Sequence, residues 1–211
     1  MTPDSLSRVA VFVDGSNLYF AVREGLHRQD IIDVEKLASK LTRERQLIRI
    51  YYYHVPMLEG DSEAARRHQS FLNRLSYVDY LQLRLGRLVP RPVKIRCLSC
   101  GKDIAYTTHI QKGVDTRIVI DMVGLALLDA YDVAILVSGD ADLAEAVNFI
   151  KEHTRKYVEN ACVMWQGWAK NLREAADVRT RLTEEFLLDC WVQKERKFRS
   201  PLLAAQQRAV Q

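Results

Sequence analysis

Short apolar runs alternate along the chain with longer segments whose apolar residues recur at helical spacing. Residues 9–13 and 133–137 are short, apolar and rich in β-branched side chains, which is typical of buried strands. Such alternation predicts an α/β fold with a central, mostly parallel sheet covered on both faces. The expected strands are residues 8–13, 47–55, 80–88, 133–137 and 157–164, and the expected helices are residues 17–24, 34–45, 62–75, 114–131, 140–153, 172–176 and 183–194.

Residues 90–108 interrupt this alternation and predict a β-hairpin arm inserted into the core fold. Two β-like stretches, residues 93–95 and 104–106, lie on either side of a turn that contains two cysteines. Basic side chains surround that turn: Arg91, Lys94, Arg96 and Lys102. We expect residues 1–195 to form one domain that includes the arm, and residues 196–211 to form a basic tail.

Cys97 and Cys100 have the spacing of half a zinc site. A structural zinc site has four ligands, and the sequence contains no second pair of cysteines at this spacing. Two interpretations follow: a metal knuckle completed by His109 or by another chain, or a plain hairpin tip, which we favour. Cys162 and Cys190 lie in apolar surroundings and are expected in the core.

The composition is ordinary for a globular protein, with 48% hydrophobic and 27% charged residues. The 31 basic and 27 acidic residues give a net charge of +4, which permits nucleic-acid binding without requiring it. No apolar run is long enough to span a bilayer, and the first residues lack the pattern of a signal peptide. We therefore expect a cytoplasmic protein with reduced cysteines.

Acidic residues follow two of the buried strands. Asp14 closes the first apolar run, Asp140 and Asp142 follow the run at residues 133–137, and Asp115 opens a long helical pattern. In an open α/β sheet, ligands bind outside the carboxyl ends of the strands. Carboxylates gathered there repel one another unless a cation joins them, and hard divalent ions prefer oxygen ligands. The sequence thus predicts a Mg²⁺ or Mn²⁺ site, with phosphodiester cleavage as its leading use.

Helix capping is the structural alternative for these turns. Ser16 or Asn17 can cap the helix that follows the first strand, which leaves Asp14 for another role. Asp140 alone could be an N-cap, but two aspartates separated by one residue fit a metal site better because their repulsion is costly without a cation.

Three neighbouring residues have two interpretations each. Asp115 is a metal ligand or a first-turn acid, and Lys112 is a solvated charge or a contact for a phosphate oxygen. Asp121 lies six residues beyond Asp115, so it points roughly 120° away around the helix. It either supports the site or pairs with a neighbouring basic residue.

Other catalytic signatures are absent from the sequence. It contains no phosphate-binding G-x-x-x-x-G-K-[ST] loop, no Gly-rich dinucleotide turn after the first strand and no G-x-S-x-G nucleophile elbow. The five histidines have no ligand spacing. A phosphatase of small phosphoesters stays a weaker alternative, since the first strand lacks a D-x-D-x-[TV] motif.

Several short motifs resemble those of the NYN domain family, in its LabA-like bacterial branch, within the PIN-like nuclease superfamily. They lie at residues 11–18, 112–115, 121–122, 136–143 and 171–177. The resemblance implies a three-layer α/β/α PIN-like, Rossmann-like fold and a metal-dependent ribonuclease site. Its acidic cluster would be Asp14, Asp115, Asp140 and Asp142, supported by Asn17 and Ser138. Leu143 stands where the family usually has an aromatic residue.

The leading hypothesis is hydrolysis of single-stranded RNA by metal-activated water. Arg66 and Arg67 on the helix at residues 62–75, together with the four arm cations, are candidates to follow the RNA backbone. Tyr51, Tyr52, Tyr53 and Tyr106 are candidates to stack on bases, although most are expected in the core. The alternative is a regulatory module that binds RNA or protein without cutting. The sequence leaves open whether the chain forms a homodimer.

Overall fold

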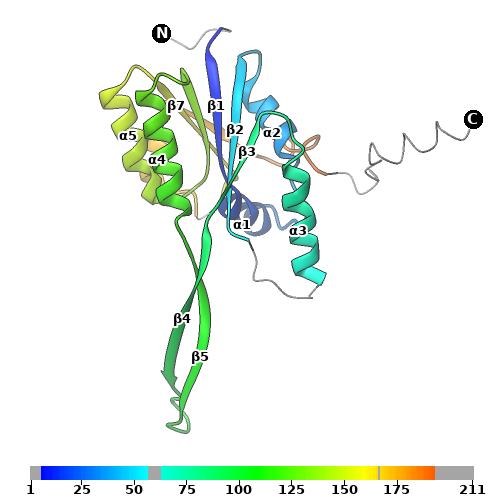
Figure 1. Ribbon diagram of the computed structural model, residues 1–211, viewed down its shortest axis with the longest axis vertical. Coiled ribbons are helices and arrows are strands. Elements are labelled where there is room, and N and C mark those ends of the chain that lie inside the picture. The colour runs from blue at the N-terminus through cyan, green and yellow to red at the C-terminus, as the bar shows by residue number, and fades with distance from the viewer. Residues whose placement is uncertain (1–5, 57–62, 166, 193–211) are drawn as a thin grey trace, which may run out of the picture.

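The computed structural model describes residues 6–56, 63–165 and 167–192 of the chain, and the predicted basic tail lies outside these ranges. Six parallel strands form one sheet in the order β3-β2-β1-β6-β7-β8. Figure 1 labels β1, β2, β3 and β7 of this sheet. The strands of this sheet are β1 Arg8–Asp14, β2 Gln46–His54, β3 Leu81–Leu85, β6 Val133–Val137, β7 Tyr157–Cys162 and β8 Val178–Arg181. The predicted α/β fold with a mostly parallel sheet is confirmed.

Helices cover both faces of the sheet and make three layers. The helices are α1 Gly15–Gly25, α2 Val34–Thr42, α3 Glu63–Leu75, α4 Val114–Leu127, α5 Ala144–His153 and α6 Lys170–Ala175, with a 3-10 turn, η1 Ala141–Leu143, before α5. Side chains of β1 alternate between the two layers. Val11 packs with α1, α2 and α3, whereas Phe12 packs with α4, α5 and α6. Because both faces are buried, β1 has an almost continuous apolar sequence.

The chain reverses its direction of winding beside β1. From β1 the strands proceed outward through β2 to β3, and the chain then returns to place β6 on the other side of β1. This junction between β1 and β6 is the topological switch point of the sheet, where open α/β folds bind ligands. The residues that follow β1 and β6 therefore meet at one edge.

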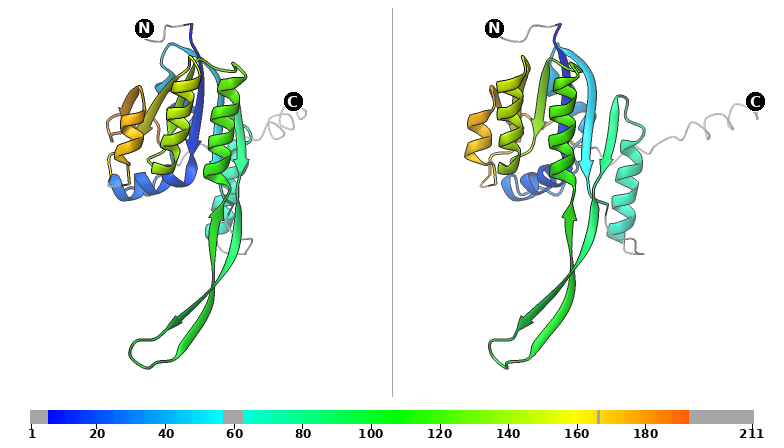
Figure 2. Two further views of the ribbon diagram at one scale, coloured as in Figure 1. Left: turned by 90° about the vertical axis from the view of Figure 1, so that its left-hand side faces the viewer. Right: turned by 60° about the vertical axis from the view of Figure 1, so that its left-hand side comes forward.

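A two-stranded antiparallel arm projects from the carboxyl end of the sheet (Figures 1 and 2). Its strands are β4 Arg87–Arg96 and β5 Asp103–Lys112, so the arm is longer than the expected residues 90–108. Pro90 and Pro92 fit within β4 because each strand of a two-stranded ribbon has an open edge where a residue without an N–H can lie. The expected strand at residues 80–88 is divided at Gly86 into the whole of β3 and the start of β4.

The last part of the fold differs from the sequence prediction. Strand β8 was not predicted, and the helix expected at residues 183–194 is wrong for its described part, which consists of turns and a bridge from Trp191 to Ile32. The Cys190 carbonyl accepts a hydrogen bond from Asp33 N at 2.7 Å, and Val192 N donates to Ile31 O at 2.9 Å. The segment thus makes turns and then bonds to a distant part of the same chain, in place of the continuous bonds of a helix. Across the described ranges, no helix is both long and apolar enough to span a membrane.

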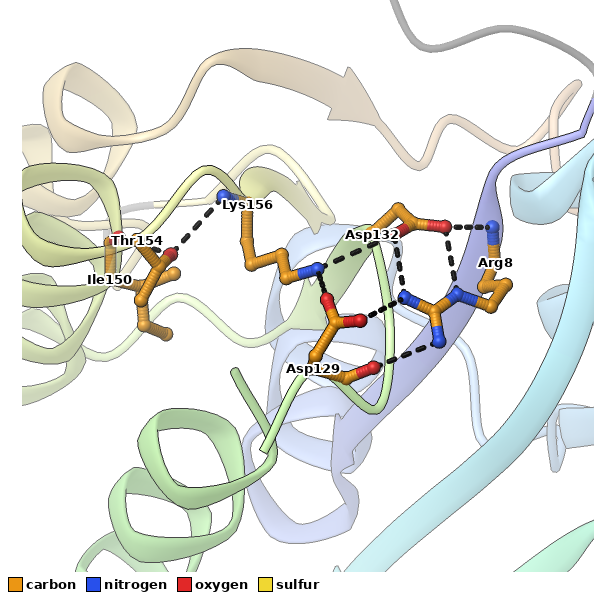
Figure 3. A network of polar contacts seen from close by, with 6 residues as sticks. All are labelled: Arg8, Asp129, Asp132, Ile150, Thr154 and Lys156. Carbon is orange, nitrogen blue, oxygen red and sulfur yellow. Dashed lines mark hydrogen bonds and ion pairs between the residues drawn. The ribbon is translucent and has the colours of Figure 1, made fainter. Parts of the chain in front are cut away.

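An ion-pair network joins the starts of three neighbouring strands at the edge opposite the acids (Figure 3). Arg8, which begins β1, donates from Nε and Nη2 to the two carboxylate oxygens of Asp132 at 3.0 and 2.8 Å. Lys156, just before β7, pairs with Asp129 and lies 3.4 Å from Asp132. The Arg8 guanidinium holds the pKa of Asp132 well below its usual range.

We expect Asp132→Asn to lower the free energy of unfolding by about 1–2 kcal/mol near neutral pH, since the pair is charge-assisted but about one-third exposed. A depressed carboxyl pKa gives stability that is present above the usual pKa near 4 and is lost as pH falls below it. Denaturant titrations from pH 7 to pH 2 should therefore show the two proteins converging in acid. A constant gap over that range would contradict the ion-pair account.

Candidate metal centre

Asp14 lies at the end of β1 and is 4% exposed. Its Oδ1 accepts a hydrogen bond from Asn17 N at 3.0 Å, so Asp14 itself is the N-cap of α1. The expectation that Ser16 or Asn17 caps this helix is therefore wrong. The second carboxylate oxygen of Asp14 accepts from Ser138 Oγ at 3.2 Å.

Ser16 and Asn17 connect the first turn to its surroundings. Ser16 Oγ donates to Gln111 Oε1 of the arm at 3.2 Å. Asn17 Oδ1 accepts from the Gly139 amide at 2.8 Å, which joins the turn after β1 to the turn after β6. Both side chains thus position the two turns.

Gly15 is required for space at this turn. A Cβ at Gly15 would lie 2.5 Å from the ring and hydroxyl of Tyr52, a buried residue of β2. Its φ is not in the left-handed region, so backbone conformation does not explain this glycine. Its role is to let α1 start directly over the Tyr52 ring.

Asp140 begins the second acidic turn. Its Oδ1 accepts from Asp142 N at 3.0 Å and caps η1, while its own amide donates to Ser138 Oγ at 3.2 Å. Ser138 is 1% exposed and bonds to both Asp14 and Asp140. Asp140 therefore caps η1 with one oxygen and still takes part in the acidic cluster, because its carboxylate points to the other acids.

Asp115 lies at the start of α4. Gly113, with φ +86° in the left-handed region, is the N-cap of this helix, so Asp115 lies in the first turn and is not the cap. Gly113 tolerates this φ at no steric cost. The chain thereby leaves β5 and presents the Asp115 carboxylate toward the edge between β1 and β6.

Asp14, Asp115 and Asp140 each contribute one carboxylate oxygen to a group whose atoms all lie within 4.8 Å of one another. Burial raises the pKa of Asp14 to about 6, with smaller contributions from Asp115 and Asp140. The pKa of Asp115 is also raised, first by burial and then by Asp140 and Asp142. Three oxygen donors of like charge at this spacing fit a hard divalent cation such as Mg²⁺ or Mn²⁺.

The other predicted residues lie around this cluster or apart from it. Asp142 is exposed and outside the group of three, although its charge acts on Asp115. Asp121 accepts from Tyr53 Oη at 2.8 Å and pairs with Arg84 Nε at 3.3 Å, as the alternative interpretation expected. Lys112 is exposed at the end of β5, next to Gly113.

A hollow of about 300 Å³ opens over the three acids. Two of its walls, Phe20 of α1 and Gln111 of the arm, were not predicted from the sequence. Phe20 is 48% exposed. The only signal of Phe20 in the sequence was its position as an aromatic residue on the polar side of α1. The lining residues are Asp14, Ser16, Asn17, Phe20, Gln111, Gly113, Val114, Asp115 and Asp140.

Residues 8–183 match a family model described as the NYN domain. The chain belongs to the NYN domain family. NYN domains are generally PIN-like nucleases, and the three clustered acids give this one a place for a metal. The fold is similar to the crystal structure of a protein of unknown function from Vibrio parahaemolyticus, with a TM-score of 0.60 and 21% identity over 89% of this chain and 99% of that chain. No curated protein matches the chain.

A buried asparagine supports the acidic edge of the NYN domain from below. Asn160 of β7 is 0% exposed and donates from Nδ2 to Leu136 O at 3.0 Å and to Ser138 O at 2.8 Å. Its Oδ1 accepts from Trp168 Nε1 at 2.7 Å. Asn160 thus fixes the backbone of the turn that carries Ser138. Sequence reasoning missed it because a polar residue within a strand pattern is usually exposed.

The predicted RNA contacts are separate from the acids. Arg67 pairs with Glu63 on the surface of α3, and Arg66 lines a second hollow of about 450 Å³ along that helix. The four arm cations are exposed, but Arg91 and Lys94 face opposite sides of β4, so they form no single stripe.

Three of the four tyrosines proposed for base stacking are excluded by burial. Tyr51, Tyr52 and Tyr53 are 8%, 4% and 0% exposed, which confirms the expectation of core roles. Tyr106, on the arm, is 50% exposed.

Asp14→Asn should stabilise the metal-free NYN domain above pH 7. A carboxyl pKa raised to about 6 means that ionisation above that pH costs folding free energy, and asparagine resembles the neutral form. We expect a gain of about 1–3 kcal/mol at pH 8 with EDTA, which falls to about half at pH 5 and disappears below the usual aspartate pKa near 4. Mn²⁺ should raise the Tm of wild type and leave that of the variant unchanged.

The control for this measurement is Glu152→Gln, an exposed carboxylate at the far end of α5. It should follow wild type at both pH values, with and without metal. A lower Tm for Asp14→Asn at pH 8 would show that the capping bonds of Asp14 outweigh its electrostatic cost.

Proposed function

We propose that this NYN domain is a metal-dependent ribonuclease of the LabA-like branch, which hydrolyses phosphodiester bonds of single-stranded RNA with Mg²⁺ or Mn²⁺. The observation that carries the proposal is the convergence of Asp14, Asp115 and Asp140, with carboxylate oxygens within 4.8 Å of one another at the switch point. Carboxylates placed this closely are costly without a cation. The electrostatic cost of this cluster therefore supports binding of a divalent ion between the three acids.

Each acid has a distinct part in the proposed reaction. A bound divalent ion supplies Lewis-acid chemistry, which lowers the pKa of an attacking water and offsets charge on the phosphate. Asp14 is the fixed ligand, because Asn17 N and Ser138 Oγ restrain its two oxygens. Asp115 and Asp140 complete the oxygen set from α4 and from the turn after β6. Asp142, exposed next to this set, is placed to orient water.

The substrate preference is inferred from the walls of the hollow. Phe20 exposes about half of its surface beside the acids, and an exposed ring stacks on a base only where that base is free of a duplex. Gln111 offers an amide to the same space. An RNA strand bound there passes the base of the arm, where Lys112 can neutralise a phosphate.

The decisive experiment is cleavage of a labelled single-stranded RNA with Mg²⁺, Mn²⁺ or EDTA. Asp14→Asn, Asp115→Asn and Asp140→Asn should each reduce the rate at least about a hundred-fold, because each removes a ligand of the ion. Glu152→Gln should cut as fast as wild type. Asp142→Asn should show an intermediate loss, since Asp142 lies outside the group of three.

Absence of cutting in every metal, with RNA still bound, would favour the regulatory module that binds RNA without cleaving it. Turnover of a chromogenic phosphomonoester in place of RNA would favour the phosphatase. Circular dichroism of each variant separates loss of chemistry from loss of fold.

RNA binding should distinguish the surfaces of the NYN domain. Phe20→Ala should weaken binding of single-stranded RNA by about 1–3 kcal/mol at any salt concentration, since it removes stacking. A paired change, Arg91→Ala with Lys94→Ala, should instead reduce the slope of log affinity against log salt by up to about 1.4, because each phosphate that the protein neutralises contributes about 0.7 to that slope.

The matched control is Arg66→Ala with Arg67→Ala, which removes the same charge from α3. Fluorescence anisotropy at several salt concentrations measures the RNA affinity of wild type and of the three variants. An unchanged slope for the arm variant and a reduced slope for the α3 variant would move the RNA path from the arm to α3.

A further inference from the structure

The tip of the arm carries two free thiols that lie outside the hydrophobic core. The arm has ten residue pairs, from Arg87 and Lys112 at its base to Arg96 and Asp103 at its end. The turn beyond them contains Cys97, which is half-buried, and Cys100, which is exposed. The acidic site and the fold do not explain a pair of cysteines at this position.

The backbone of the turn is arranged around Cys97. Cys97 N donates to Lys102 O at 2.8 Å, and Gly101 N donates to Cys97 O at 2.9 Å. Gly101 has φ +69°, the left-handed conformation that lets the chain curl back immediately after Cys100. The Ser99 hydroxyl lies 3.1 Å from Cys97 Sγ. Together these contacts form a knuckle in which the backbone of Cys97 is held and the Ser99 hydroxyl reaches its sulfur.

These donors favour the thiolate, which is the form that binds metals. Hydrogen bonds from the Ser99 side chain, and then from the backbone of Cys100 and Ser99, lower the pKa of Cys97 to about 6. By contrast, burial raises the pKa of Cys162 to about 12. The knuckle therefore differs from an ordinary buried cysteine in its chemistry as well as its exposure.

The knuckle supplies only half of a tetrahedral zinc site. His109 pairs with Pro90, six residue pairs from the end of the ribbon, so it lies about 20 Å from the tip. This removes His109 as a third ligand. Cys162 and Cys190 are 2% and 0% exposed within the core. Among the described residues, the one group of three or more candidate ligands is the acidic cluster, so none of these residues completes the knuckle within the same chain.

We propose that the arm tips of two copies of this chain bind one zinc ion between them, with Cys97 and Cys100 of each copy as its four ligands. Zinc in structural sites is tetrahedral and commonly takes four cysteine thiolates. A second copy brings an identical pair of thiols, and a two-fold axis through the ion relates the two knuckles. The assembly closes at two chains.

Charge complementarity supports a second copy as the occupant. Arg96 and Lys102 flank the knuckle, and Arg96 Nε donates to Gly101 O at 3.1 Å. Asp103, the partner of Arg96 in the ribbon, is the acid of the tip. Without the ion and its thiolates, two such tips would repel each other through their cations. Four thiolates around Zn²⁺ carry a net charge of −2, which the flanking cations of both copies offset.

Apolar surface at the tip also favours this occupant. Leu98, between the two cysteines, is fully exposed, and Ile95 and Ile104 are each 48% exposed on one face of the ribbon. An isolated two-stranded ribbon is at best marginally stable in water. A shared metal and the apolar contact that accompanies it would stabilise the end farthest from the core.

The test is zinc content and molar mass of the full chain, purified under reducing conditions. We expect one zinc ion per two chains by elemental analysis, and a dimer by light scattering that becomes a monomer when zinc is chelated. Cys97→Ser with Cys100→Ser should contain no zinc and be a monomer, with unchanged circular dichroism and Tm of the core. Cobalt substitution should give the absorption of four thiolates per ion.

Asp14→Asn is the control for the acidic site and should keep both the zinc and the dimer, so this result is independent of ribonuclease activity. The proposal is overturned by one zinc per chain in a monomer, by a monomer without zinc after zinc is added, or by a dimer that survives in the double cysteine variant. A Cys97–Cys100 disulfide, found as a mass two hydrogens lower in the purified protein, would indicate a redox pair instead.

Discussion

The acidic edge depends on the hydrogen bonds that join the turn after β1 to the turn after β6. Asn17 reaches the Gly139 amide, and Ser138 reaches Asp14, so each turn holds the other. Asn160 fixes the second turn from within the sheet. Without these bonds, the carboxylates of Asp14 and Asp140 would separate, because their charges repel. The parallel pairing of β1 with β6 brings the turns together, and these polar contacts keep them at a spacing that suits an ion.

This arrangement concentrates an electrostatic cost in one place. The core on both sides of the sheet is apolar and well buried, and at the opposite edge Arg8 and Lys156 neutralise Asp132 and Asp129. At the carboxyl edge, no cationic side chain is among the nine residues that line the hollow over the acids. Carboxylates at the two ends of the sheet thus have different surroundings. At one end they pair with cations of the protein, and at the other they lie next to one another without such a cation in the lining of the hollow.

Much of the fold could be predicted because its signals are local. Residues 133–137 have the boundaries expected of β6, since five apolar residues between polar turns allow no other buried strand. The segment at 183–192 was mispredicted because its apolar spacing fits a helix, whereas it makes only local turns and its end bonds to the distant residues 31–33. Asp14, Asp115 and Asp140 could be picked out as strand-end and helix-start acids. The cap formed by Asp14, the support from Asn160 and the wall formed by Phe20 depend on tertiary contacts that no local pattern encodes.

The arm also has a consequence for how such a chain can vary. It leaves the sheet after Gly86 and returns at Gly113, and its first residue pair joins Arg87 to Lys112. Insertions or deletions of matched pairs farther out would lengthen or shorten the ribbon while the register of all six core strands stays the same. A change of one pair would turn the tip to the opposite face, since side chains alternate along a strand. The length of the arm and the direction in which its tip faces can therefore change while the acidic edge of the sheet stays the same.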